Sequence, residues 1–272
     1  MQQLLLLGAV YLETRKFELA IDMYNKAIKL NNNSSFYFYS RGTAYLNIHD
    51  FNNALNDFNK CIELNPDDDS YYTGRGKVYL ATGSLNDAIP DFKKALEINP
   101  DQLTALAMLG TCYFRLRDYD EALSYSKRME KINPDNYQIY LSEGDCYMFM
   151  KKYNEAIKAY NKAIELNPED DRAQMNLGWS YYCANDFQKC IDCSKKAIEL
   201  NENNIHAKFN LAISTLRLGK VDEAYALYSK YYRESQKKNI NIRGGVEDLE
   251  DLIDKNINVK EANYIIKEIL KF

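Results

Sequence analysis

The chain has 272 residues, of which 46% are hydrophobic and 27% are charged, and its formal net charge is −4. This composition supplies a packed core, which excludes a disordered chain, and the acidic balance gives no electrostatic basis for binding nucleic acid. Only 11 glycines and 5 prolines are present, too few for the many turns of a β-sandwich or barrel.

No targeting or membrane segment is expected. The apolar run at residues 4–12 is too short to span a bilayer, and no basic region precedes it as in a signal peptide. The six cysteines lie within helical patterns, which is typical of a reducing compartment. We therefore predict a cytoplasmic protein with no membrane span.

One phrase of the sequence recurs at a fixed distance. NKCIELNP at residues 59–66 returns as NKAIELNP 102 residues later, which is three periods of 34 residues. Looser copies begin at Asn25, Lys93, Lys127 and Lys195, on the same period. A fixed period of this length indicates a repeat architecture.

Four positions of the 34-residue unit keep a residue type when residue 1 is taken as position 1. Positions 8 and 20 are small, position 11 is mostly tyrosine and position 24 is mostly aromatic. Unit by unit, these residues are Gly8, Tyr11, Ala20 and Tyr24; Gly42, Tyr45, Ala54 and Phe58; Gly76, Tyr79, Ala88 and Phe92; Gly110, Tyr113, Ala122 and Ser126; Gly144, Tyr147, Ala156 and Tyr160; Gly178, Tyr181, Cys190 and Ser194; Ala212, Thr215, Ala224 and Tyr228.

This pattern resembles the tetratricopeptide repeat family, with departures at Ser126, Ser194, Ala212 and Thr215. The resemblance implies an all-α fold, a right-handed superhelical solenoid of antiparallel helix pairs. The small residues let two helices approach closely, and each pair must stack on its neighbours because it cannot bury its own apolar face. The seven expected units are residues 1–34, 35–68, 69–102, 103–136, 137–170, 171–204 and 205–238.

The first unit begins at once with four leucines at residues 4–7, and no capping segment precedes it. Two interpretations stay open. The chain is either a regulatory or targeting arm of a larger protein, or its first repeat pairs with another molecule, including a second copy of the chain.

The second and third units carry a charge pattern of their own. Position 7 is Arg41 and Arg75, and only in these units is position 23 acidic, as Asp57 and Asp91. Because a buried guanidinium needs a carboxylate partner, we predict structural ion pairs across packed helices. Arg75 has two candidates, Asp57 of the preceding unit and Asp91 of its own, and an anion-binding site is the functional alternative.

Proline in the third unit tests the register of the repeat. A proline is tolerated in the first turn of a helix but costs about 3 kcal/mol in its interior. Pro90 therefore predicts that the second helix of this unit begins near Asn86 and not earlier.

The sixth unit contains two cysteines three residues apart, Cys190 and Cys193, with Cys183 nearby. A thiol-redox or zinc protein is the remote alternative that this pattern raises. However, Cys190 occupies the buried position 20, and the two histidines, His49 and His206, are not patterned with the cysteines. We expect core packing, no metal and no cofactor.

No catalytic set is found in the sequence. It contains no phosphate-binding glycine loop, no nucleophile elbow and no metal-binding helix motif. We therefore do not expect an enzyme.

The resemblance implies that first helices line a concave groove through positions 2, 5, 9 and 12, which form one stripe. This groove would bind another protein, as an extended peptide or an amphipathic helix, with Met175, Trp179, Tyr182 and Phe209 as an apolar anchor. In the alternative interpretation, aromatic residues of the stripe only pack between repeats. This alternative does not extend to Trp179, the single tryptophan, which we expect to bind the partner. The candidate groove residues are Phe36, Tyr39, Lys77, Asp145, Met148, Arg172, Met175, Asn176, Trp179, Tyr182, His206, Phe209 and Asn210.

Some family members bind the acidic end of heat-shock chaperones through a two-carboxylate clamp built from lysine, arginine and asparagine. The nearest positions here are Leu141, Asp145, Asn176, His206 and Asn210, which lack every required cation. This partner is therefore not expected.

The repeat pattern stops near residue 239, and residues 239–272 are expected to form a linker and C-terminal capping helices. The polar stretch at residues 237–245, with Gly244 and Gly245, predicts the linker. Apolar stripes after Val246 and around Ile265 predict one or two helices that cover the last unit. The sequence as a whole predicts a protein-interaction scaffold or adaptor.

Overall fold

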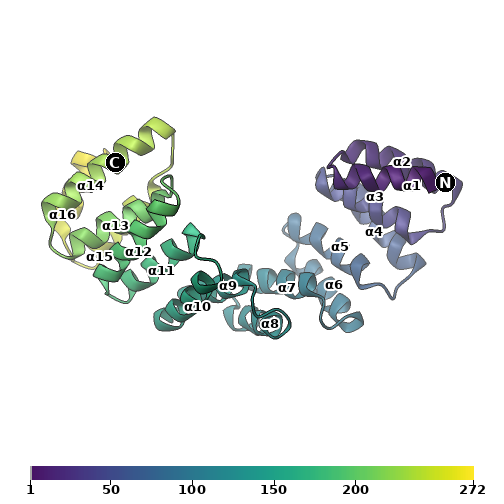
Figure 1. Ribbon diagram of the computed structural model, residues 1–272, viewed down its shortest axis with the longest axis horizontal. Helices are drawn as coiled ribbons and strands as arrows, with labels where there is room; N and C mark the ends of the chain where they lie inside the picture. The colour runs from purple at the N-terminus through teal and green to yellow at the C-terminus, as the bar shows by residue number, and fades with distance from the viewer. Residues whose placement is uncertain (1) are drawn as a thin grey trace. The chain divides into compact units, whose positions relative to one another are not determined.

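The computed structural model describes residues 2–272, which form helices joined by short turns, with no strand among them (Figure 1). The chain is therefore all-α, and consecutive helices pack as antiparallel pairs. It divides between Ile132 and Asn133 into two compact units, each larger than a single 34-residue repeat. We call these two parts the first unit and the second unit, and the 34-residue segments are called repeats.

The first unit holds eight of the helices described. Each helix packs on the next, and α3 and α7 also contact α5. Their bounds are α1 Gln2–Glu13, α2 Phe17–Leu30, α3 Ser35–Asn47, α4 Phe51–Leu64, α5 Asp69–Ala81, α6 Leu85–Ile98, α7 Leu103–Arg115 and α8 Tyr119–Ile132.

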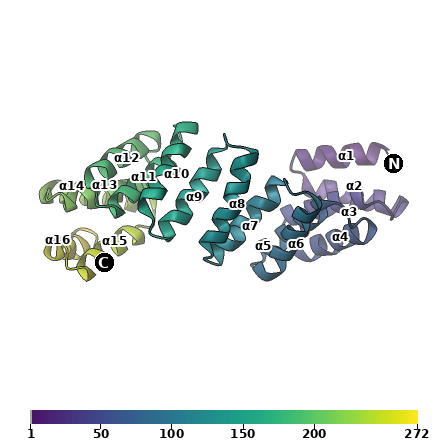
Figure 2. The ribbon, with the colours of Figure 1, turned by 90° about the horizontal axis from the view of Figure 1, so that it is seen from below.

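The second unit continues the same arrangement and adds a C-terminal segment beside α13 and α14 (Figure 2). Its last regular pair is followed by two short helices and a π-helical turn. The bounds are α9 Tyr137–Phe149, α10 Tyr153–Leu166, α11 Asp171–Cys183, α12 Phe187–Leu200, α13 Ile205–Arg217, α14 Val221–Lys238, α15 Arg243–Asp254, α16 Val259–Tyr264 and η1 Ile265–Ile269.

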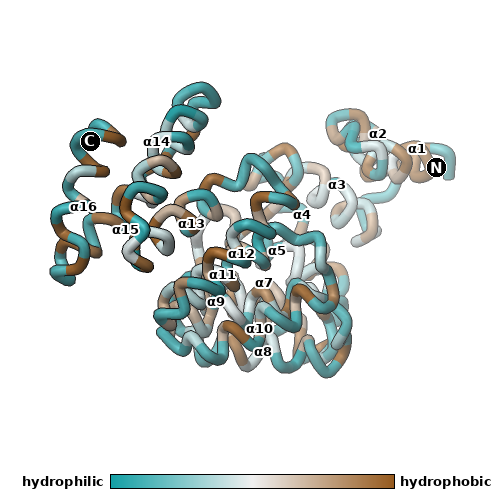
Figure 3. The backbone as a smooth tube through the Cα atoms, turned by 60° about the vertical axis from the view of Figure 1, so that its left-hand side comes forward, coloured by the Kyte–Doolittle hydropathy of each residue, from teal (hydrophilic) through white to brown (hydrophobic). Residues whose placement is uncertain are grey.

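The helices form because apolar residues recur at helical spacing, so brown and teal alternate along each tube in Figure 3. Side chains at several helix starts accept a backbone N–H of the first turn, which otherwise has no partner. These capping residues are Asp50, Asp68, Gln102, Asn136, Asp170, Asp186 and Asn204.

The small residue at position 8 makes room for the aromatic residue at position 24 of the same pair. A Cβ atom added to Gly76 would lie 2.7 Å from Cε1 of Phe92, and one added to Gly144 would overlap the ring of Tyr160. Where position 24 is Ser126, a Cβ on Gly110 would lie 3.8 Å from the Ala122 carbonyl oxygen, an ordinary van der Waals contact. The packing therefore requires glycine at Gly76 and Gly144, where a ring lies against it, and does not require it at Gly110.

Two arginines of the first unit lie against the aspartates of their own helix pairs. Arg41 reaches Asp57, and Arg75 reaches Asp91 with Nη2 2.7 Å from Oδ1. The alternative pairing of Arg75 with Asp57 is not adopted. Both aspartate side chains are buried, at 4% and 7% exposure, so these are structural ion pairs.

Two boundaries differ from the sequence prediction. Helix α6 begins at Leu85, one residue before the predicted start, which puts Pro90 beyond the first turn. The predicted linker at residues 237–245 is wrong at both ends, because α14 runs to Lys238 and α15 begins at Arg243. Gly245 lies inside α15 as a close-packing residue, since a Cβ there would lie 2.6 Å from Cδ1 of Phe209.

The outer face of α1 is apolar and open within the first unit. Leu6 is 67% exposed and Val10 is 42% exposed. Self-association through this face stays a prediction. None of the helices described has the length and apolar character needed to cross a membrane.

Candidate functional site

Helix α11 carries the single tryptophan of the chain at the surface of the second unit. Asp170 caps the helix by accepting the N–H groups of Arg172 and Ala173, both at 3.0 Å. Trp179 is half-buried and stacks on Tyr182, with ring centroids 4.8 Å apart and planes 10° apart. The indole is therefore held in one orientation while part of it stays open to solvent.

Trp179 forms one wall of an open cavity of about 260 Å³, which we call the first cleft. Helices α9, α10 and α11 supply its walls. Its lining residues are Asp145, Met148, Phe149, Tyr160, Asn176 and Trp179. Three large apolar side chains thus surround a small group of polar ones.

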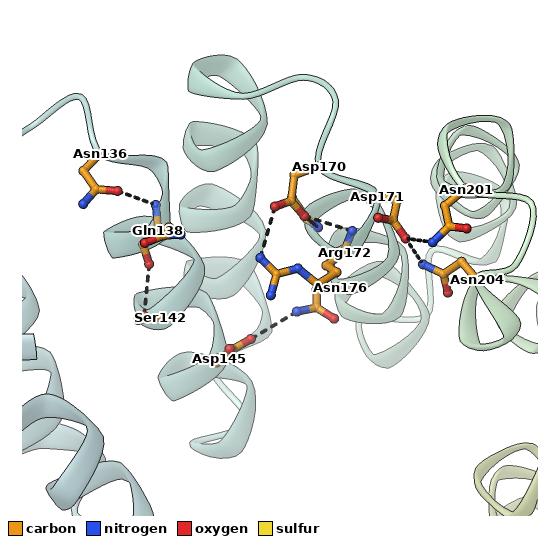
Figure 4. Close-up of polar contacts among 11 residues, drawn as sticks. Asn136, Gln138, Ser142, Asp145, Asp170, Asp171, Arg172, Asn176, Asn201 and Asn204 are labelled. Atoms are coloured by element: carbon orange, nitrogen blue, oxygen red, sulfur yellow. Dashed lines mark hydrogen bonds and ion pairs between the residues drawn. The ribbon is translucent and has the colours of Figure 1, made fainter. Parts of the chain in front are cut away.

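The polar group of the first cleft is a hydrogen-bonded network. The Tyr160 hydroxyl donates to Oδ1 of Asp145 at 2.6 Å, and Asn176 Nδ2 donates to the same oxygen at 3.2 Å, as Figure 4 shows for Asn176. Burial raises the pKa of Asp145 above its ordinary value, although the Tyr160 hydrogen bond opposes this. Within residues 2–272, Oδ2 of Asp145 accepts no hydrogen bond, so it can accept one from a ligand.

A second cleft of about 400 Å³ also has Trp179 in its lining. It adds Tyr182 from α11, Arg217 at the end of α13, and charged residues of α15 and the turn that follows it, Asp248, Asp251 and Lys255. The Arg217 guanidinium lies over the rings of Phe187, at 4.3 Å, and Tyr182, at 5.9 Å.

The structure brings four of the predicted groove residues together around the first cleft, namely Asp145, Met148, Asn176 and Trp179. Sequence reasoning missed Phe149 and Tyr160. Phe149 follows Met148 at position 13, outside the stripe considered, and Tyr160 holds the core position 24. The Phe149 side chain is 61% exposed, and the repeat pattern alone does not predict this exposure.

Three predicted groove residues are buried instead, which corrects the expected apolar anchor. Phe209 is 3% exposed, Asn210 is 5% exposed and Tyr182 is 9% exposed. Helix α15 packs on α13, and Gly245 lies directly against the Phe209 ring. The C-terminal segment therefore covers the face that these positions would otherwise present.

The other predicted groove residues of α11 and α13 do not line a common site. Arg172 is exposed, and its Nη2 lies 3.2 Å from Oδ2 of Asp170, so its charge is engaged at the helix start (Figure 4). Met175 is half-buried, and His206 is exposed beside Gly244.

In the first unit, Phe36 is 51% exposed and meets the Tyr24 ring edge-on. Tyr39 follows the packing alternative, because its ring contacts the rings of Phe58 and Tyr71 at 5.9 and 5.5 Å. Lys77 is half-buried, and desolvation lowers its pKa.

The cysteine pattern of the sixth repeat lies in a setting that disfavours thiolates. Cys190 is fully buried, and burial raises its pKa, while burial raises the pKa of Cys193 to about 12. A reactive cysteine needs the opposite shift. No group of three or more His, Cys, Asp or Glu side chains within residues 2–272 is placed to hold a metal ion.

Family models match successive parts of the chain. Two models described as tetratricopeptide repeat match residues 4–34 and 35–68. The model of the anaphase-promoting complex, cyclosome, subunit 3 matches residues 81–163 and 150–231. No curated protein sequence gives a significant match.

Several solved structures are similar to the chain. One is YrrB, described as a TPR protein with an unusual peptide-binding site, at 24% identity over 68% of this chain and 95% of that chain, with a TM-score of 0.59. MamA is 26% identical over 62% and 92%, with a TM-score of 0.58. The C-terminal part of a TPR repeat-containing protein from Cytophaga hutchinsonii is 16% identical over 88% and 97%, with a TM-score of 0.72.

Proposed function

The chain belongs to the tetratricopeptide repeat family, and we propose that it is a non-catalytic scaffold that captures a segment of a partner protein at Trp179. The partner presents an extended or helical stretch, and one of its apolar side chains enters the first cleft. The observation that carries this proposal is the cleft itself, with an indole held by stacking beside a hydrogen-bonding carboxylate.

The size and lining of the first cleft support a side chain as its occupant. Pockets for drug-sized ligands measure roughly 300–1,000 Å³, and this cleft is smaller, at about 260 Å³. Met148, Phe149 and Trp179 provide apolar contact, and Asp145 and Asn176 provide polar groups at the base. A rigid aromatic residue in a partly desolvated pocket is the typical energetic centre of a protein interface.

The state of the cysteines supports a non-catalytic protein and its placement in the cytoplasm. All six cysteines are free thiols, which favours a reducing compartment such as the cytoplasm. Burial raises the pKa of Cys61 and Cys146 to about 12, as it does for Cys193, so these thiols stay protonated near neutral pH. Their role is therefore packing.

Selection from a displayed library of random peptides tests the proposal. Peptides that bind the wild-type chain are synthesised, and their affinity is measured for Trp179→Ala and for Phe272→Ala. Phe272 is the matched control, because it is an exposed aromatic of the same unit, at 55%, outside both clefts. We expect Trp179→Ala to weaken binding at least about tenfold and Phe272→Ala to leave it unchanged.

Circular dichroism establishes that both variants keep their helices and melting temperature. Equal affinity of folded Trp179→Ala and wild type would overturn the proposal. Failure to select any peptide would do the same.

A further inference from the structure

The second cleft has a charge arrangement that the first cleft lacks. It lies where α15 faces α11 and α13, and its lining includes two carboxylates, Asp248 and Asp251, and two cations, Arg217 and Lys255. The cleft is therefore not a simple acidic cluster.

Three of these four charges are already engaged. Lys255 Nζ lies 2.7 Å from Oδ2 of Asp251, and the Arg217 guanidinium covers two aromatic rings. Asp248 is the exception, because it makes no hydrogen bond or ion pair within residues 2–272. Its side chain is half-buried, and partial burial disfavours an unpaired carboxylate.

The surroundings of Asp248 increase its need for a positive partner. Its own helix adds like charges from Asp251 and Glu247, and burial with these charges raises the pKa of Asp248 to about 7. The titratable groups that face it from α11 and α14 are Tyr182, Cys183 and Tyr228. The two cations of the cleft, Arg217 of α13 and Lys255, are held by aromatic rings and by Asp251 and form no ion pair with Asp248 within residues 2–272.

We propose that the second cleft receives a basic side chain, lysine or arginine, of the captured partner segment, with the Asp248 carboxylate as its counter-charge. This inference rests on the proposed function, because it concerns the same segment. Trp179, which is half-buried, supplies aromatic surface in the same cleft, and this suits a cation with an apolar stem. A charge-assisted hydrogen bond to Asp248 supplies the partner that the fold lacks.

Because Trp179 lines both clefts, the basic side chain and the apolar side chain of the segment contact the same indole. They must therefore lie close together in the partner. The partner chemistry that follows is a peptide with one large apolar residue beside a lysine or arginine.

Peptide selection at about pH 8, where Asp248 is mostly ionised, tests this inference on the whole chain. The library is selected against wild type, Asp248→Asn and Asp254→Asn. Asp254 is the matched control, as an exposed aspartate at the end of the same helix that lines neither cleft. We expect wild type and Asp254→Asn to enrich lysine and arginine, and Asp248→Asn to lose that enrichment while it keeps the apolar residue.

A selected peptide then gives the magnitude. Replacing its basic residue by norleucine or citrulline should weaken binding to wild type at least about tenfold and leave binding to Asp248→Asn almost unchanged. Lowering the pH from about 8 to about 6 should weaken binding to wild type about tenfold, because Asp248 with a pKa of about 7 becomes protonated. Asp248→Asn should show no such change.

The outcomes separate the two proposals. If peptides bind and need Trp179 but a neutral replacement costs nothing, or costs the same in Asp248→Asn, the basic-residue inference is wrong and the scaffold proposal stands. If no peptide is selected, both are wrong. Because asparagine matches aspartate in shape, a folded Asp248→Asn chain with an unchanged circular dichroism spectrum is the condition for the comparison.

Discussion

Arg41 and Asp57 form a two-point ion pair that joins helices α3 and α4. Arg41 donates from Nε to Oδ2 of Asp57 at 2.8 Å and from Nη2 to Oδ1 at 2.6 Å. Its remaining terminal nitrogen, Nη1, donates to Oδ1 of Asn25 on α2 at 2.6 Å. One guanidinium therefore connects three consecutive helices, and Arg75 repeats the arrangement with Asp91 and Asn59.

Removal of one member of this pair should be costly, and removal of both should not. Asp57→Ala leaves a guanidinium that is only 18% exposed without its carboxylate, and we expect a loss of about 3 kcal/mol in the free energy of unfolding. The double variant Arg41→Leu with Asp57→Met copies Leu7 and Met23 of the first repeat, and it should lie within about 1 kcal/mol of wild type.

Denaturant unfolding followed by circular dichroism measures these values, since Trp179 lies in the other unit and does not report on this one. Additive losses in the double variant would show that the two residues do not act as a pair.

Glycine at position 8 should be more important for stability at Gly76, which faces the Phe92 ring, than at Gly110. Gly76→Ala places a methyl group 2.7 Å from Phe92, and the overlap should cost about 1–3 kcal/mol. In Gly110→Ala the added methyl group would lie 3.8 Å from the Ala122 carbonyl oxygen and 4.0 Å from Cβ of Tyr125, so it causes no overlap. The higher helix propensity of alanine should therefore leave stability unchanged or raise it by up to about 1 kcal/mol. Thermal unfolding of the two variants compares them directly, and equal losses would contradict the packing account.

Asp248 should make the second unit less stable as the pH rises. Its pKa in the folded chain, about 7, exceeds the unfolded value of about 3.9, so the folded state binds more protons between these values. The free energy of unfolding therefore falls as the pH rises from about 4 to about 7.

Asp248→Asn removes this dependence of the free energy of unfolding on pH. The free energy of unfolding of the variant should match that of wild type near pH 4 and exceed it by about 2 kcal/mol near pH 8, because solvent screening reduces the effect of the raised pKa of Asp248. Urea unfolding monitored by Trp179 fluorescence at the two pH values measures the difference. A difference independent of pH would contradict the assignment of the shift to Asp248.

Most of the fold that could be predicted from the sequence follows from the 34-residue period. It places Gly76 opposite Phe92 and Arg41 beside Asp57 because each contact lies within one helix pair, where spacing determines neighbours. The start of α6, which Pro90 was expected to define, differs by one residue, since helix starts depend on local hydrogen bonds as well as residue type.

The candidate site depends on contacts that no period predicts. Phe209 occupies a position that faces the groove by register, yet α15 covers it through Gly245. The covering segment lies outside the repeat, so its docking place is set by shape rather than spacing. Phe149 lines the first cleft although it lies outside the predicted stripe of groove positions. It is the last residue of α9, one position after Met148.

Collisional quenching of Trp179 tests the central claim most directly, because the chain has one tryptophan and its fluorescence reports on one place. The measurement uses acrylamide and a selected peptide free of tryptophan, with excitation where tyrosine does not absorb. We predict that saturating peptide lowers the quenching constant, because the captured side chain shields the open part of the indole. A quenching constant that stays the same while the peptide is fully bound would place the binding site elsewhere and contradict the account.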